Sequence, residues 1–153
     1  MVMFQNSHGG YMQSLIILLF TLLVSSSLSA NVSVDQLDKL YSKPSPFESI
    51  PESEWVAQSE NAFVIKAKSP QAPVHLLVIP KKRIPTILQA SEELIGEMFS
   101  LARKAAKENA IAQDGFRVII NTHPYGGQGV YHLHIHVLGG KELGWSPGFR
   151  LEG

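Results

Sequence analysis

The alternation of hydrophobic and polar residues predicts two strands early in the chain. One stretch of alternation covers residues 62–67, and a second, mostly apolar stretch covers residues 74–79 and ends at Pro80. Between them lies the segment 69–73, Ser-Pro-Gln-Ala-Pro, whose prolines interrupt strand pairing. Two strands joined by a short proline-containing loop indicate an antiparallel hairpin.

A helical repeat follows the second strand. Ser91 can cap a helix whose first turn carries Glu92 and Glu93, and these acidic side chains complement the positive end of a helix dipole. We expect the helix to end before Gly115. Its apolar positions recur at helical spacing; they are Leu94, Ile95, Met98, Leu101, Ala102 and Ala105.

Two more strands are predicted after the helix. Residues 116–121 read as a strand, residues 122–129 as a glycine-rich loop, and residues 130–138 as a strand that Gly139 and Gly140 close. Strands, one long helix and more strands predict an α+β fold, in which the helix packs on one face of an antiparallel sheet.

The N-terminal 30 residues have a different composition. Every Lys, Arg, Asp and Glu lies between Asp35 and Glu152, whereas residues 15–24 are an apolar run and residues 25–30 are mostly small. This is typical of a signal peptide, and the run is shorter than the roughly 20 residues of a membrane span. We predict a signal peptide over residues 1–30 and an exported protein, periplasmic or secreted. An uncleaved N-terminal membrane anchor and a misassigned start are the alternatives.

Residues 31–59 are polar and interrupted by Pro44, Pro46 and Pro51. We expect an irregular lead-in there, with short helical possibilities at residues 34–41 and around Trp55. The remaining residues 60–153 would form the main domain.

Charge and cysteine content exclude some functions. Among 153 residues, 13 Lys and Arg balance 13 Asp and Glu. This argues against binding to nucleic acid or to an anionic membrane surface, because both need a basic excess. The chain has no cysteine, so neither a disulfide nor a cysteine metal site is possible.

Three histidines alternate at the end of the chain. On a strand, His132, His134 and His136 would share one face, and Leu133, Ile135 and Val137 would point the other way. His132 and His136 would lie roughly 13 Å apart, too far for both to reach one zinc ion. No carboxylate lies between Gly115 and Lys141. We therefore expect neither metal nor cofactor, and keep a zinc hydrolase, to which His75 could add a ligand, as an alternative.

The candidate pocket is rich in donors and poor in negative charge. It would combine the imidazoles with the Asn121 amide, the Gln128 side chain and the backbone N–H groups of Gly126, Gly127 and Gly129. Such a pocket suits phosphate. A neutral imidazole is also a competent nucleophile towards phosphorus.

On these residues the chain resembles the histidine triad (HIT) family, and its Hint branch most closely. The matching stretches are residues 69–82, the Gly126-Gly127-Gln128 loop and residues 131–140. Trp145 with Pro147-Gly148 fits the C-terminal end of the family.

The resemblance implies a HIT-like fold that dimerises by joining two sheets into one continuous sheet. It also implies hydrolysis of purine nucleoside phosphoramidates through a nucleotidyl-histidine intermediate, without metal or cofactor. His134 would be the nucleophile, His136 would bind phosphate, and His132 and His75 would orient the nucleophile. The implied substrate contacts are Asn121, Gly127, Gln128, Gly129 and Trp145.

Two positions depart from the family pattern. Ala67 occupies the place of an Asp that grips the ribose, and Gly129 the place where Ser or Thr often lies near the leaving group. These departures predict weaker nucleoside binding, and either slow turnover or a leaving group that needs no proton. A second function is therefore an exported HIT-fold module that binds nucleotide or phosphate with little or no catalysis.

Overall fold

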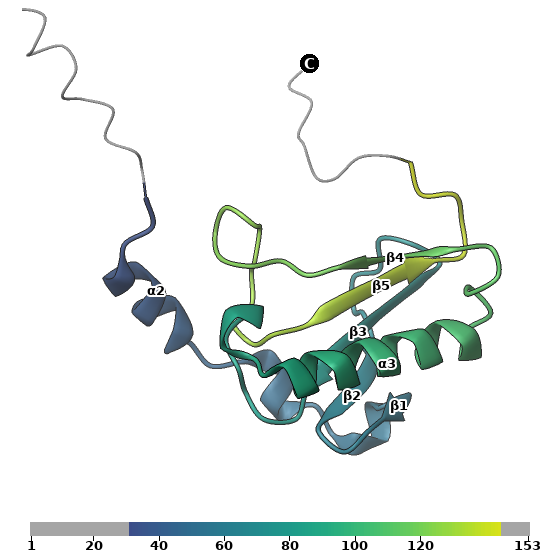
Figure 1. Cartoon of the computed structure of the whole chain (residues 1–153), viewed down its shortest axis with the longest axis horizontal. Helices are drawn as coiled ribbons and strands as arrows, with labels where there is room; N and C mark the ends of the chain where they lie inside the picture. The colour runs from purple at the N-terminus through teal and green to yellow at the C-terminus, as the bar shows by residue number, and fades with distance from the viewer. Residues whose placement is uncertain (1–30, 145–153) are drawn as a thin grey trace, which may run out of the picture. The chain divides into compact units, whose positions relative to one another are not determined.

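An antiparallel sheet of five strands forms the centre of the fold. The computed structural model describes residues 31–144 of the chain. Within this range the sheet order is β1-β2-β3-β5-β4 (Figure 1), and all neighbouring strands are antiparallel. The strands are β1 (Ala57–Gln58), β2 (Ala62–Lys66), β3 (Val74–Pro80), β4 (Phe116–Ile119) and β5 (Ile135–Gly139). The β2–β3 hairpin confirms the pairing predicted from the sequence.

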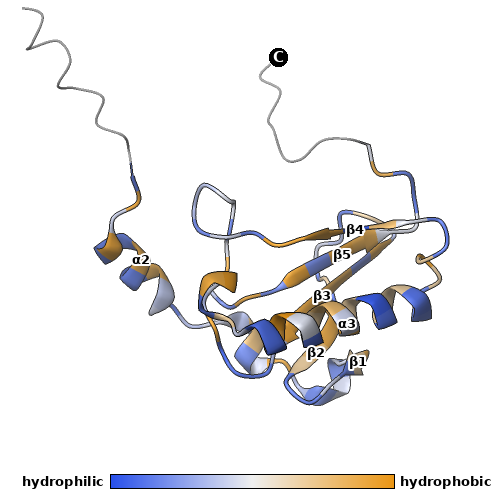
Figure 2. Ribbon diagram, viewed as in Figure 1, coloured by the Kyte–Doolittle hydropathy of each residue, from blue (hydrophilic) through white to orange (hydrophobic). Residues whose placement is uncertain are grey.

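The long helix α3 (Glu92–Glu108) covers one face of this sheet. Its N-cap is Ser91, whose hydroxyl accepts a hydrogen bond from the Leu94 N–H at 3.3 Å. The helix ends before Gly115, as predicted, and Ala110 beyond it has a φ of 55°. Figure 2 shows hydrophilic stretches along α3. The buried residues of α3 are Met98, Leu101, Ala102, Ala105 and Ala106. A helix packed on one face of an antiparallel sheet confirms the predicted α+β class.

The sheet separates two groups of hydrophobic side chains. Val64, Leu76 and Val137 pack beneath α3. Phe63, Ile65, Leu77 and Ile79 form a second group, against which Phe47, Ile50 and Trp55 pack. Because strand residues alternate between faces, His75 and His136 point away from α3.

The last strand is shorter than predicted. We expected it to begin at Val130, but β5 begins at Ile135, so His132 and His134 precede it. Its partner β4 already ends at Ile119, which lies opposite His136. The Leu133 N–H instead donates to the carbonyl of Ile84 at 2.6 Å. A tertiary contact therefore replaces the expected ladder.

The N-terminal part of the described chain contains several short elements. They are α2 (Val34–Tyr41), two 3₁₀ turns at Pro46–Ser49 and Glu52–Glu54, and β1. The predicted short helix at 34–41 is thus present, and the segment is more ordered than the irregular lead-in that its prolines suggested. A third 3₁₀ turn, Ile87–Gln89, precedes α3.

The proposed signal peptide, residues 1–30, lies outside the described residues. No helix within residues 31–144 has the length and apolar content of a membrane span. The domain boundaries at residues 30 and 60 stay predictions.

Candidate active site

Four histidine rings gather on the sheet face opposite α3. His75 lies on β3 and His136 on the adjacent β5, while His132 and His134 lie in the segment leading into β5. The His134 and His136 ring centroids are 4.9 Å apart, and those of His75 and His136 are 5.2 Å apart. The rings of His132 and His134 both pack against Phe47 in T-shaped arrangements. The sequence thus identified all four rings of the cluster.

One hydrogen bond fixes the proton of His134. Its Nδ1 lies 2.8 Å from the backbone oxygen of His132. A carbonyl oxygen only accepts, so Nδ1 carries the proton and donates it. In the neutral ring the lone pair is then on Nε2, and His134 presents a nucleophilic nitrogen. The residue is 8% exposed, so it is largely removed from bulk water.

A second chain of hydrogen bonds fixes the proton of His136. The Gln71 N–H donates to Nδ1 of His75 at 3.1 Å, which makes that nitrogen an acceptor. The proton of His75 is therefore on Nε2, which lies 2.9 Å from Nδ1 of His136. His136 accepts there and keeps its own proton on Nε2. In the neutral ring that N–H is the group able to donate to a phosphate oxygen.

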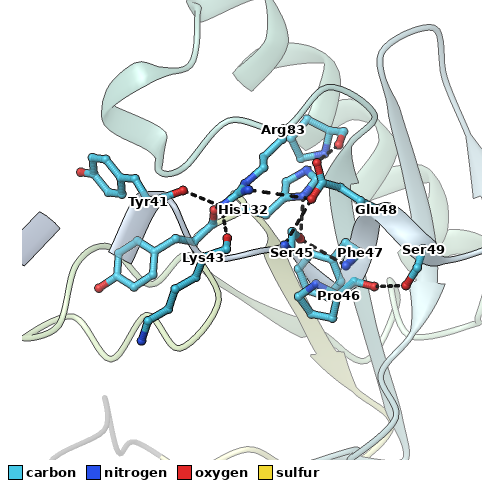
Figure 3. A network of polar contacts seen from close by, with 11 residues as sticks. Tyr41, Lys43, Ser45, Pro46, Phe47, Glu48, Ser49, Arg83 and His132 are labelled. Atoms are coloured by element: carbon cyan, nitrogen blue, oxygen red, sulfur yellow. Dashed lines mark hydrogen bonds and ion pairs between the residues drawn. The ribbon is translucent and has the colours of Figure 1, made fainter. Parts of the chain in front are cut away.

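His132 is held at both ring nitrogens and is 1% exposed. Its Nε2 lies 2.9 Å from the carbonyl oxygen of Pro80, so Nε2 carries the proton. Its Nδ1 then accepts from the Ser45 hydroxyl at 2.9 Å (Figure 3). His132 therefore contacts His134 through its backbone and not through its ring, whereas His75 contacts His136.

Burial keeps this cluster uncharged at neutral pH. Desolvation is the main cause that lowers the pKa of His75, His132 and His134. For His136, desolvation, together with charge repulsion from His134 and His75, lowers the pKa to about 4. A neutral His134 is what nucleophilic attack requires.

The glycine-rich loop is stabilised by Gln128. The Gln128 side chain accepts from the His123 N–H at 3.0 Å and donates to the carbonyls of Pro85 at 2.7 Å and Val130 at 3.1 Å. Both amide protons are used within the fold. Its backbone N–H also donates to the carbonyl of His123. The sequence interpretation of this side chain as a phosphate donor is thus replaced by a role in holding the loop.

Two glycines of the loop meet a steric requirement. A Cβ on Gly126 would lie 2.1 Å from the backbone oxygen of Thr122, and Gly127 has a φ of 74°. The Gly127 N–H donates within the loop to the carbonyl of Pro124. Gly129 differs from Gly126 because a Cβ there would meet nothing within 4 Å, and from Gly127 because its φ is not positive.

The other predicted contacts have a mixed outcome. Asn121 is half-buried just beyond the end of β4. Trp145 lies outside the described residues. The N–H of Ala67, which the resemblance sets at the place of a ribose-binding Asp, donates to the carbonyl of His75 at 2.9 Å. This bond sets Ala67 beside the histidine cluster.

The sequence interpretation missed the contribution of residues 41–49. Figure 3 shows the Arg83 side chain reaching toward Tyr41 and Lys43, and Ser45 beside His132. The Nη2 of Arg83 donates to the carbonyl of Tyr41 at 2.6 Å and also to the carbonyl of Lys43. Its Nη1 lies 3.8 Å from the Glu48 carboxylate. The Ser45-x-x-Glu48 spacing is a capping signature and could have predicted the turn at Pro46–Ser49. It carries no sign of the contact with His132.

Within residues 31–144, no group of three or more His, Cys, Asp or Glu side chains is arranged to hold a metal ion. The ring nitrogens whose partners are described above point to backbone groups, a hydroxyl or another imidazole.

Comparison with known proteins gives a consistent result. The HIT domain model of protein families matches residues 50–143. The purine nucleoside phosphoramidase of Escherichia coli (strain K12) is 45% identical over 95 residues, covering 60% of this chain and 80% of that protein. A 14 kDa zinc-binding protein of Zea mays is 36% identical over 121 residues, covering 73% and 94%. The crystal structure of a HIT family hydrolase from Legionella pneumophila Philadelphia 1 has 36% identity and a TM-score of 0.64, and covers 69% of this chain and 100% of that one.

Proposed function

The chain belongs to the HIT domain family, and from this premise we propose that it hydrolyses the P–N bond of purine nucleoside 5′-phosphoramidates. The family match, together with relatives named as a hydrolase and a phosphoramidase, supports a hydrolase that acts on a small nucleotide. The observation that carries the finer proposal is the hydrogen bond from His134 Nδ1 to the His132 carbonyl, because it leaves Nε2 as the nucleophile.

The reaction has two steps. His134 Nε2 attacks phosphorus, a P–N bond to the ring forms, and the substrate's own P–N bond breaks as the amine leaves with a proton taken from solvent. Water then hydrolyses the nucleotidyl-histidine and releases the nucleoside monophosphate. In the nucleotidyl-histidine intermediate the His134 ring is a cation, because phosphorus is bonded to Nε2 while Nδ1 keeps its proton. The His132 carbonyl accepts from that Nδ1–H and stabilises the cation. The Nε2–H of His136 donates to a phosphoryl oxygen.

A substrate comparison tests this function. The purified protein is incubated with adenosine 5′-phosphoramidate, with a dinucleoside polyphosphate and with a phosphoester that lacks a nucleoside. We expect the phosphoramidate to be cleaved with the highest kcat/KM. Tight AMP binding without turnover of any of the three would instead support the binding module. Full activity after chelator treatment, with metal analysis of the same sample, would exclude the zinc hydrolase.

Two further proposals concern the setting of this activity. We infer that the protein forms a homodimer in which two sheets join, since β4 is the terminal strand of the described sheet on the side of the histidine strand β5. We also infer export, on the apolar run and the small residues of positions 15–30. Membrane attachment would follow only if that segment is retained.

A further inference from the structure

Ser45 is connected to the candidate nucleophile through His132. The Ser45 side chain comes from a segment far from the histidines in sequence, yet the residue is only 7% exposed. Its hydroxyl lies 2.9 Å from Nδ1 of His132. The opposite nitrogen of the same ring is held by the Pro80 carbonyl. With both nitrogens engaged, the ring of His132 has one orientation and one tautomer.

We propose that Ser45 is a positioning residue for His134, acting through His132. The Ser45 hydroxyl donates to the His132 ring, and the His132 carbonyl accepts from His134 Nδ1. A displaced His132 moves that carbonyl, and His134 can then rotate or place its proton on Nε2, which removes the nucleophile. This inference rests on the proposed function, since it assigns Ser45 a part in the same reaction.

The hydroxyl of Ser45 also caps a turn, and it does so through its oxygen and not through its proton. Its oxygen accepts from the Phe47 N–H at 3.1 Å and so caps the turn at Pro46–Ser49, while the Glu48 carboxylate accepts from the Ser45 N–H at 3.2 Å. Capping needs the lone pair, whereas positioning needs the hydroxyl proton. Phe47 also contacts His134 by its ring, at a centroid distance of 5.3 Å. The segment therefore contacts His134 directly through Phe47 and indirectly through Ser45 and His132.

Four variants separate positioning from capping. Ser45→Ala removes both functions of the hydroxyl. Glu48→Ala removes both the reciprocal cap and the ion pair with Arg83, but leaves the Ser45 hydroxyl in place. Ser49→Ala removes an exposed hydroxyl of the same turn, which bonds only to the carbonyl of Pro46 at 3.1 Å among the contacts described. Ser45→Thr restores the hydroxyl, and the extended backbone at Ser45, with φ −92° and ψ 130°, accommodates a β-branched residue.

The test measures kcat, KM and the tautomer of His134. We expect Ser45→Ala to lower kcat by about ten-fold or more, because small displacements of a reacting group are costly. Its KM should stay within about two-fold of wild type, since no substrate contact is lost. Ser45→Thr, Glu48→Ala and Ser49→Ala should each keep kcat within about two-fold. Nitrogen NMR of the imidazoles should show Nδ1–H for His134 in the wild type and a mixture of tautomers in Ser45→Ala.

The readouts keep two failures apart. If the wild type cleaves no phosphoramidate, the proposed function fails, while the tautomer of His134 still decides whether Ser45 positions it. A Ser45→Ala protein with unchanged kcat and an unchanged His134 tautomer would overturn the inference. Equal losses in Ser45→Ala and Glu48→Ala would also overturn it, because they would reduce Ser45 to a cap. A Ser45→Thr protein as slow as Ser45→Ala would count against the hydroxyl.

Discussion

The protons of the buried histidines are placed by partners that can only accept or only donate. The backbone oxygens of His132 and Pro80 accept from His134 and His132, and the backbone N–H of Gln71 donates to His75. These three contacts leave no choice of tautomer in the neutral rings. The spacing of the histidines alone does not make His134 a nucleophile and His136 a donor. Their hydrogen-bond partners do, because these partners decide which ring nitrogen carries the proton.

The lowered pKa of His136 predicts acid sensitivity of the fold. The ordinary pKa of a histidine side chain is 6.5, whereas burial and the neighbouring His134 and His75 lower the pKa of folded His136 to about 4. Between these two pH values the unfolded chain binds more protons than the folded one. The free energy of unfolding should therefore fall as the pH is lowered through this window. Urea unfolding at a series of pH values measures this, and His136→Gln should show a weaker dependence. An identical pH dependence in the variant would contradict the assignment.

Gly129 offers a site for gain of function. A Cβ there meets nothing within 4 Å, so Gly129→Ser should fold normally. A hydroxyl near the leaving group could supply the proton that the departing amine needs, and we expect kcat to rise by about ten-fold or more. Steady-state kinetics on the phosphoramidate measures the effect.

Two neighbouring glycines serve as controls for that substitution. Gly127→Ser places a side chain at φ 74°, and Gly126→Ala drives a Cβ against the Thr122 oxygen. Both should destabilise the loop without any gain in kcat. No gain in Gly129→Ser would show that proton supply to the leaving group does not limit turnover.

At the scale of elements, regular periodicity made most of the fold predictable. The apolar stretches of β2 and β3 and the helical spacing of α3 are local patterns, and the structure confirms these elements. The predicted start of β5 was wrong because the Leu133 N–H donates to the backbone carbonyl of Ile84, a residue that lies outside the strands. Such a contact leaves no trace in alternation.

The site was predictable only in its residue types. The alternation of His132, His134 and His136 is visible in the sequence, and the structure brings these residues together with His75. The inward-turned Gln128 side chain and the contact of Ser45 with His132 depend on how distant segments pack. For the same reason the role of residues 41–49 could not be seen beforehand.

Arg83 should control the order of that segment. Its guanidinium donates to the carbonyls of Tyr41 and Lys43. Arg83→Ala should therefore raise amide hydrogen exchange over residues 41–49 while protection of the β2–β3 hairpin persists. Arg117→Ala is the matched control, because Arg117 holds the carbonyls of Leu143 and Gly144 elsewhere in the fold. Unchanged exchange in Arg83→Ala would show that other contacts hold the segment.

The whole molecule is expected to work as a pair. Strand β4 has β5 as its one neighbour in the described sheet, so its outer edge carries backbone groups able to pair with another strand. Sedimentation equilibrium should give twice the chain mass at micromolar concentrations. A monomer at every concentration would contradict the proposed joining of two sheets, without touching the chemistry of His134.

The most direct measurement is mass spectrometry of the protein quenched during turnover of adenosine 5′-phosphoramidate. We predict that the intact mass rises by one adenylyl group and that peptide mapping places the group on His134. His134→Ala, checked for a native fold by circular dichroism, should form no adduct and lose turnover. Rapid turnover with no adduct on His134, together with His134→Ala retaining more than about a tenth of the wild-type rate, would contradict nucleophilic attack by this ring.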